Sequence, residues 1–381
     1  MKGVRFHAPT RIVFGNGVMS QFRDIVQNEI GAASFFLVTD EGIIKSGIAE
    51  RLIRQLSNVT VFDGVEQNPK NNTVDRAGDK IRAAKPDCVV GLGGGSALDA
   101  AKAIALLATN PGKIEDYEGK AQYTKPPLPV LAVPTTCGTG SEVTWVSVIT
   151  HTARKFKMSI KGPEMFPAVA VVDPDLLSTL PPHLVASTGL DALTHAVEAL
   201  SVKPATFLTD FIALEALKLI LHSIEAAYKD IQGNTLAREE IMKGSLVAGL
   251  AFGNADVGGV HCLSESLGAI LDTPHGIANS IFLPFVMEFN VPVAAEKYAK
   301  IAKLAGLQGE NDVASAMALI EYIKNLALKL DIPTFRDTGI QESQLMEIAL
   351  KSFENNSNSS NPREATEQDY LKILQKAYAE K

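Results

Sequence analysis

Residues 87–109 read DCVVGLGGGSALDAAKAIALLAT, and this stretch decides the fold of the first half of the chain. It begins with a short apolar run, continues through three glycines, and ends in an alanine- and leucine-rich segment. The apolar run is typical of a buried strand, and the last segment is typical of a buried helix. A strand that turns directly into a helix is the repeating unit of parallel sheets covered by helices. The stretch therefore predicts an α/β domain.

Strand and helix patterns alternate on both sides of this stretch. Apolar strand patterns occur at RIVFGNGV, SFFLVTDEG, NVTVFDGV, LPVLAVPTT and VAVVDPDLL, and helical patterns at IAERLIRQL and NTVDRAGDKIRAAKP. After about residue 183 nearly all patterns are helical. We therefore expect an α/β domain with a parallel sheet over residues 1–182, and an all-α domain over residues 183–381.

The last part of the chain contains an Asn- and Ser-rich tract, NNSNSSNP, at residues 355–362. Its composition predicts a surface loop. An amphipathic pattern follows, with Tyr370, Ile373, Leu374 and Ala377 on one face, and predicts a final helix.

Composition excludes several classes of partner. The 36 Lys and Arg residues are outnumbered by 43 Asp and Glu residues, and the basic ones are dispersed. This argues against nucleic acid and anionic membranes as partners. Three widely spaced cysteines form no disulfide framework and fit a reducing compartment. The N-terminus lacks a signal-peptide pattern, and no uninterrupted apolar run reaches spanning length. We expect a cytoplasmic protein.

The glycine turn predicts a phosphate-binding loop. Glycines at positions 93–95 let the backbone approach a ligand closely. Ser96 is placed to cap the following helix, and Asp99 stands at the spacing of a capping box. Unpaired N–H groups and the helix dipole then favour an anion. The turn matches neither the GxGxxG nor the Walker pattern, so a purely structural glycine turn remains the alternative.

Two further segments are predicted to lie at the same rim of the sheet. The polar turn PTTCGTGSEVT (134–144) follows the next strand, and Asp40 ends an earlier one. Ligands of open parallel sheets bind beyond the carboxyl ends of the strands, so these segments are placed to flank one nucleotide. A carboxylate at Asp40 would accept hydrogen bonds from a ribose diol and repel a 2′-phosphate. An ordinary turn residue is the alternative for Asp40.

Four side chains in the second half of the chain form a candidate metal-binding set. Asp191 and His195 lie four residues apart in the helical pattern GLDALTHAVEAL, and therefore on one helix face. His261 and His275 bracket a second helical pattern, HCLSESLGAILDTPH. One carboxylate and three imidazoles suit a divalent transition metal. Surface or capping pairs are the alternative for each pair alone.

Taken together, these segments resemble the iron-containing, or group III, alcohol dehydrogenase family. The resemblance covers nearly the whole chain. It is carried by FGNGV, GGGSALDAAKAIA, PTTCGTGSEVT, DALTHAVEA, DTPHGIANSIFLP and the NPR segment near residue 361. It implies an α/β nucleotide-binding domain, a helical domain in a dehydroquinate-synthase-like architecture, and an active site in the cleft between them. It further implies an NAD-dependent, metal-dependent alcohol dehydrogenase or aldehyde reductase acting on a small alcohol or aldehyde, and we expect a homodimer.

The resemblance assigns roles to individual residues. It implies Asp191, His195, His261 and His275 as ligands of a divalent metal, with Fe²⁺ expected and Zn²⁺ as the alternative. An Asp at position 40 is similar to the NAD-preferring members. The implied contacts to NAD are Asp40, Asn68, Gly93, Gly94, Gly95, Ser96, Ala97, Thr135, Thr136, Thr139 and Lys157.

Two positions depart from the family pattern. Glu265 stands where the family usually has a second histidine, one turn after His261, and Trp145 and Val146 replace residues that are commonly Arg or Pro and Phe. Glu265 is expected on the same helix face as His261 and is the candidate catalytic residue. As a metal ligand or a partner of a ligand imidazole it fits better than as a proton relay, and an exposed helical glutamate without a role is the alternative. Trp145 either lines the substrate pocket or packs at the domain junction.

Two other functions share the predicted architecture. Dehydroquinate-synthase-like enzymes use NAD and a metal within a lyase cycle, but the Asp/His/His/His set resembles the dehydrogenases more closely. A non-catalytic nucleotide-binding protein would not need both an intact ligand set and a phosphate cradle. Net production of NADH from simple alcohols would distinguish a dehydrogenase from the lyase and from the non-catalytic protein.

Overall fold

The computed structural model describes residues 3–380, and this part of the chain divides into two compact units. The α/β unit comprises Ala8–Thr136 and Gly140–Leu180. The helical unit comprises Cys137–Thr139 and the described residues of Met1–His7 and Pro181–Lys381. The short segment Cys137–Thr139 thus belongs with the helices, although the residues on either side of it belong to the α/β unit.

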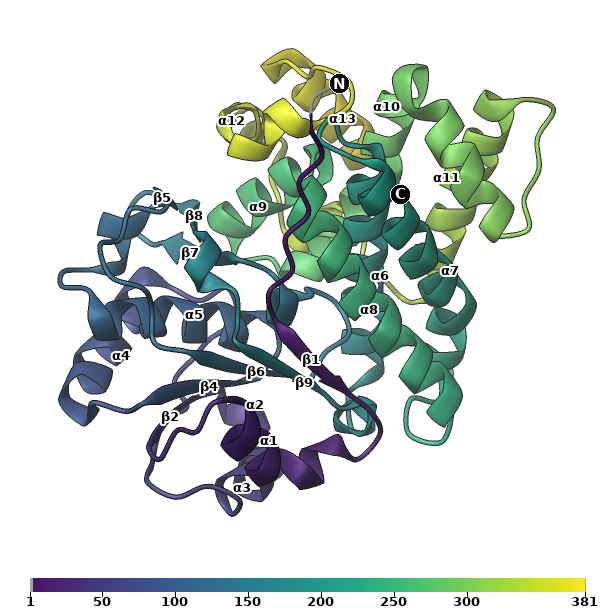
Figure 1. The fold of residues 1–381 in the computed structure, drawn as a ribbon. Coiled ribbons are helices and arrows are strands. Elements are labelled where there is room, and N and C mark those ends of the chain that lie inside the picture. The colour runs from purple at the N-terminus through teal and green to yellow at the C-terminus, as the bar shows by residue number, and fades with distance from the viewer. Residues whose placement is uncertain (1–2, 381) are drawn as a thin grey trace. The chain divides into compact units, whose positions relative to one another are not determined.

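A six-stranded, fully parallel sheet forms the centre of the α/β unit (Figure 1). Its strands, in spatial order, are β1 (Arg11–Phe14), β9 (Val169–Val172), β6 (Val130–Pro134), β4 (Cys88–Gly93), β2 (Phe35–Val38) and β3 (Val59–Phe62). The four inner strands are buried along their whole length, which explains their near-continuous apolar sequences. All six are strands that the sequence predicted, and the predicted parallel sheet is confirmed.

Alternate side chains of the central strands β2 and β4 pack into two buried clusters on opposite faces of the sheet. On β2, Phe36 and Val38 belong to one buried cluster, and Phe35 and Leu37 belong to the other. The first cluster includes side chains of α4 (Asn71–Ala84) and α5 (Gly95–Thr109). The second includes side chains of α1 (Phe22–Glu29) and α3 (Ile48–Ile53). Figure 1 shows these two pairs of helices on the two faces.

A second, three-stranded sheet in the same unit was not predicted. Its order is β5 (Gly119–Lys120), β8 (Phe156–Lys161) and β7 (Val146–His151), and β7 pairs antiparallel with β8. Residues 152–155 connect β7 to β8 and read TARK, without the Asn-Gly or Asp-Gly signature of tight hairpins. The local sequence therefore carried no strong hairpin signal.

The second unit is helical, as predicted. Its helices are α6 (Pro182–Ser201), α7 (Phe207–Lys229), α8 (Thr235–Ala255), α9 (Gly259–Leu271), α10 (His275–Leu304), α11 (Asp312–Lys329), α12 (Leu345–Glu354) and α13 (Glu367–Ala379). Among the described residues, α10 is long and apolar enough to cross a membrane, and α8 and α9 pass the same test only as a pair bent by 102°. The most apolar window of α10 is 72% buried inside the protein, as expected of a core helix.

Two local predictions are wrong. Ser96 does not cap α5, which begins at Gly95 after Gly94 and has no side-chain cap. The Asn- and Ser-rich tract is not a surface loop. It contains the short 3₁₀-helix η8 (Asn356–Ser360), and Asn361 is only 1% exposed. Asn355, Ser360 and Asn361 are buried and hydrogen-bond to distant parts of the helical unit, which composition alone does not reveal.

Asp99 belongs to a buried ionic network instead of a capping box. Its carboxylate accepts hydrogen bonds from Ser141 Oγ (2.5 Å) and Val148 N (2.9 Å). Lys102 Nζ lies 3.2 Å from Asp99 Oδ1 and donates to the carbonyls of Ser141 (3.1 Å) and Val146. The Lys102 side chain is 0% exposed, and burial lowers the pKa of its amine against the opposing charge of Asp99. This network ties α5 to the polar turn and to β7.

We expect Lys102→Met to lower the free energy of unfolding by about 3 kcal/mol or more, because the Asp99 carboxylate and two carbonyls lose their buried partner. Urea unfolding measures the change. Lys45→Met is the matched control. It removes an exposed pair with Glu41 and should leave the unfolding midpoint unchanged. Equal midpoints for both variants would show that the network does not stabilise the unit.

Candidate metal centre and nucleotide-binding residues

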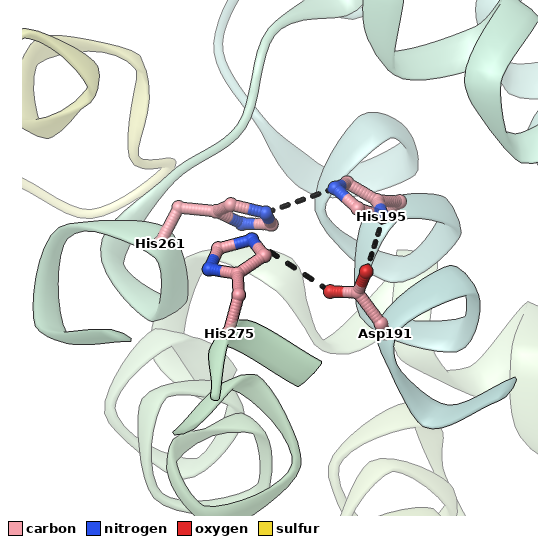
Figure 2. A group of neighbouring side chains, drawn as sticks. All are labelled: Asp191, His195, His261 and His275. Carbon is pink, nitrogen blue, oxygen red and sulfur yellow. Dashed lines mark hydrogen bonds and ion pairs between the residues drawn. The ribbon is translucent and has the colours of Figure 1, made fainter. Parts of the chain in front are cut away.

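The four predicted ligand residues converge in the helical unit (Figure 2). Asp191 and His195 lie one turn apart on α6, His261 lies in the first turn of α9, and His275 begins α10. One potential ligand atom from each residue lies within 4.8 Å of the other three. Three separate helices thus bring one carboxylate and three imidazoles to one point.

The cluster is buried and crowded with polar atoms. His195 Nε2 and His261 Nε2 are 3.0 Å apart, and Asp191 Oδ1 lies 3.7 Å from His275 Nε2. Asp191, His195 and His261 are at most 3% exposed. Burial is the main reason why the pKa of His195 falls to about 4, so this ring is neutral near pH 7. A neutral imidazole is the form that binds metals.

The residues present fit a divalent metal. Asn279 Nδ2 lies 2.7 Å from Asp191 Oδ1, 3.3 Å from His261 Nε2 and 3.1 Å from His275 Nε2. Among the described residues, the other end of this amide, Oδ1, is buried without a hydrogen-bond partner. One amide group therefore faces three acceptor atoms, which is fewer donors than the buried acceptors need. A bound cation would interact with the acceptors that lack a donor. One carboxylate and three imidazole nitrogens suit Fe²⁺ or Zn²⁺.

Glu198 is a further residue of the cluster that the sequence analysis missed. It follows Asp191 by seven positions on α6, and its side chain is 5% exposed. Its Oε2 lies 2.5 Å from His261 Nδ1, and its Oε1 accepts a hydrogen bond from Val260 N (2.8 Å). Burial lowers the pKa of His261, but the hydrogen bond to Glu198 and the negative charges of Glu198, Glu265 and Asp191 together outweigh it, so the net shift is upward. The spacing 191, 195, 198, which places three residues on one helix face, was the available signal.

Glu265 lies beside the cluster but is not among its four converging residues. It is partly buried on α9, and its Oε2 accepts a hydrogen bond from Asn355 Nδ2 (2.7 Å). Its negative charge contributes to the raised pKa of His261. A catalytic or metal-supporting role for Glu265 stays a prediction.

Trp145 packs within the α/β unit. Its ring stacks on Phe166, with centroids 6.5 Å apart, and Lys120 Nζ lies 5.1 Å from the ring centroid. These contacts account for its position as a packing residue, and a place in the substrate pocket stays a prediction.

The predicted phosphate cradle forms a tight turn at the carboxyl end of β4. Gly93 has φ = 148°, and a Cβ there would lie 2.7 Å from Ala97 Cβ, so only glycine fits. Helix α5 begins at Gly95 without a side-chain cap, so no capping side chain competes with an anion for the N–H groups of Gly95 and Ser96. Thr136, after β6, lies against Gly94.

Asp40 lies beside this turn. Its Oδ1 accepts a hydrogen bond from Ile43 N (3.0 Å) and so caps α2 (Glu41–Lys45), while its Oδ2 lies 3.2 Å from the position of a Cβ on Gly93. Elsewhere in the unit, Lys157 Nζ donates a hydrogen bond to Asn68 Oδ1 (2.7 Å), and both residues are buried. Thr135 and Thr136 lie in the α/β unit, whereas Thr139 belongs to the helical unit. Binding of NAD by all of these residues stays a prediction.

Comparison with known proteins agrees with this geometry. Residues 9–174 match the model "Iron-containing alcohol dehydrogenase", and residues 185–378 match "Fe-containing alcohol dehydrogenase family, C-terminal". The NAD-dependent methanol dehydrogenase of Bacillus methanolicus is 36% identical, over 98% of this chain and 99% of its own length. A crystal structure of 1,3-propanediol oxidoreductase is similar with a TM-score of 0.94 and 36% identity, over 99% of this chain and 100% of that one.

A third similar structure is that of sulfoacetaldehyde reductase from Bifidobacterium kashiwanohense in complex with NAD⁺, with a TM-score of 0.89, 30% identity and complete coverage of both chains, 100% each. These matches define an oxidoreductase. The chain belongs to the iron-containing alcohol dehydrogenase family. The predicted family, fold class and enzyme class are therefore confirmed.

We expect Glu265→Gln to weaken metal retention by up to about tenfold and to leave the shape of the pH profile of kcat/KM unchanged. Glutamine keeps an acceptor for Asn355 but removes a negative charge that faces His261. Timed removal of metal by a chelator measures retention. Glu296→Gln, an exposed change on α10, is the control. Normal retention together with the loss of one limb of the pH profile would instead identify Glu265 as the acid–base group.

Proposed function

We propose that the protein is an NAD-dependent alcohol dehydrogenase or aldehyde reductase for small substrates, and that Asp191, His195, His261 and His275 hold its divalent metal. The observation that carries the proposal is the convergence of four ligand atoms within 4.8 Å in a buried site. Fe²⁺ is the proposed metal, in keeping with the family, and Zn²⁺ is the alternative. The matched relatives are named as dehydrogenases and reductases, which favours this activity over a lyase.

When bound, the metal supplies Lewis-acid polarisation of the substrate oxygen, and NAD supplies the acceptor for the hydride. The protein's own residues supply geometry and exclusion of water. Asp191 and His195 are fixed in relation to each other because they share one turn of α6. Asn279 donates to Asp191 Oδ1 and orients its carboxylate. Burial keeps His195 neutral and limits competition from water for the site.

In the α/β unit, the Gly93 turn and the uncapped start of α5 are proposed to bind the pyrophosphate of NAD. Asp40 would accept hydrogen bonds from the adenosine ribose, and Lys157 with Asn68 would contact the nucleotide from β8 and the segment before α4. The full proposed set is Asp40, Asn68, Gly93, Gly94, Gly95, Ser96, Ala97, Thr135, Thr136, Thr139 and Lys157.

We also propose that residues 1–182 and 183–381 are separate domains, that the protein is cytoplasmic, and that it forms a homodimer. Three buried, unpaired thiols support a reducing compartment. Light scattering of the purified protein tests the dimer.

The metal proposal predicts that His261→Ala and His275→Ala each lose turnover and most of the metal while retaining affinity for NADH. The separation is expected because the proposed nucleotide contacts lie almost entirely in the α/β unit. Elemental analysis of anaerobically purified protein and titration with NADH measure the two effects. His222→Ala, on the exposed side of α7, is the control. Full activity of metal-free His275→Ala would contradict the proposal.

The nucleotide proposal predicts that Asp40→Gly raises the NADP/NAD ratio of kcat/KM by about tenfold or more, equivalent to about 1.4 kcal/mol. The carboxylate that repels a 2′-phosphate is removed, whereas glycine is tolerated at a helix N-cap with little loss of stability. Asp40→Asn, which keeps the capping oxygen and removes the charge, separates charge from hydrogen bonding. An unchanged ratio in both variants would show that Asp40 does not contact the ribose.

A further inference from the structure

We propose that Glu198 is the residue that positions His261: it holds the ring in the tautomer whose Nε2 faces the other ligands, and it helps to cap the helix that carries the ring. This inference rests on the proposed metal set. It assigns Glu198 a role in preparing the site, and it gives a function to Asn361 of the NPR segment.

Helix α9 has no cap of its own. Its N-cap residue is Gly258, which has no side chain to accept a hydrogen bond from the N–H groups of the first turn. Two distant side chains do so. Glu198 Oε1 accepts from Val260 N (2.8 Å), and Asn361 Oδ1 accepts from Gly259 N (3.1 Å). A Cβ on Gly258 would lie 3.1 Å from the Asn361 oxygen and 3.2 Å from the Glu198 oxygen, so glycine leaves room for both. A carboxylate at this helix end also interacts favourably with the helix dipole.

Asn361 is itself held in place. It exchanges two amide hydrogen bonds with Asn290 (3.1 and 2.9 Å), and its Nδ2 also donates to the carbonyl of Arg363 (2.6 Å). The Arg363 guanidinium in turn donates to the carbonyl of Phe289 (2.8 Å). The start of α9 is therefore fixed from two sides, by α6 through Glu198 and by α10 through Asn361.

The second oxygen of Glu198 determines the tautomer of His261. An ionised carboxylate only accepts hydrogen bonds, so the contact of 2.5 Å between Oε2 and His261 Nδ1 requires the proton on Nδ1. Nε2 then presents its lone pair, and it is the nitrogen that lies 3.0 Å from His195 Nε2 among the converging ligand atoms. Carboxylates paired in this way with metal-binding histidines orient the ring and increase its basicity.

Charge supports the same role. A dication bound to Asp191 and three neutral imidazoles would leave one net positive charge in a buried site. Glu198, whose side chain is 5% exposed, supplies the compensating negative charge one residue away. Asp191, His195 and Glu198 share one face of α6, so this helix supplies two ligands directly and controls a third.

The test is Glu198→Gln in the full chain. Val260 N–H can only donate, so the amide oxygen must turn toward it and the amide NH₂ toward His261 Nδ1. That arrangement places the ring proton on Nε2, where it faces the metal position. We expect nitrogen-15 NMR of histidine-labelled, metal-free protein, recorded at a pH high enough for His261 to be neutral, to show the Nδ1–H tautomer for His261 in the wild type and the Nε2–H tautomer in the variant. Titration with Co²⁺ should show an affinity lower by about 10- to 100-fold.

Two further variants complete the design. Asn361→Ala removes a cap without touching the ring, and it should lower thermal stability while leaving the His261 tautomer unchanged. His261→Ala assigns the NMR signal and should lose Co²⁺ binding. Wild-type tautomer and Co²⁺ affinity in Glu198→Gln, or an equal tautomer change in Asn361→Ala, would overturn the role of Glu198. Undiminished Co²⁺ binding by His261→Ala would overturn the proposed ligand set instead, and the tautomer measurement would still test Glu198.

Discussion

Asp191, His195, His261 and His275 hold four ligand atoms within 4.8 Å of one another in the helical unit. Burying a carboxylate and three imidazoles without enough hydrogen-bond donors costs free energy of folding, and favourable interactions elsewhere in the unit must offset this cost. Helices α6, α9 and α10 each contribute at least one of these four residues, so the three helices must pack in an arrangement that brings the four side chains together. Metal binding and the stability of this unit are therefore linked, because a site that forms only in the folded state adds its binding energy to folding.

The α/β unit follows a different principle. Its sheet is held by apolar side chains on both faces. The exception is the network of Asp99, Lys102 and the carbonyls of Ser141 and Val146. It connects the helix that begins at the glycine turn to the polar turn after β6. The glycine turn after β4 and the polar turn after β6 are neighbours at the rim of the sheet, and this buried network holds them in a fixed relative position. The site that they form is therefore preorganised for a ligand.

Features that depend on local pattern were predictable from sequence. The six strands of the main sheet are short apolar runs bounded by glycine, proline or aspartate, and the ligand pair on α6 is visible as a four-residue spacing. Features that depend on distant partners were not. Glu198 meets His261 across 63 positions, and Asn361 meets Gly259 across 102. The Asn- and Ser-rich tract looked like a surface loop because its hydrogen-bond partners lie elsewhere in the chain. The β7–β8 hairpin was missed because its turn residues are not distinctive.

The double use of Glu198 constrains how this chain can diverge. One carboxylate contacts both the His261 ring and the start of α9, so a substitution at position 198 would disturb two contacts at once. A descendant that abandoned the metal would no longer need the first contact but would still need an acceptor for Val260 N–H. Glutamate at this position would then outlast the ligands beside it. In a relative that has lost one of the four ligands, a retained glutamate here would be evidence of ancestry, and not of a working metal site.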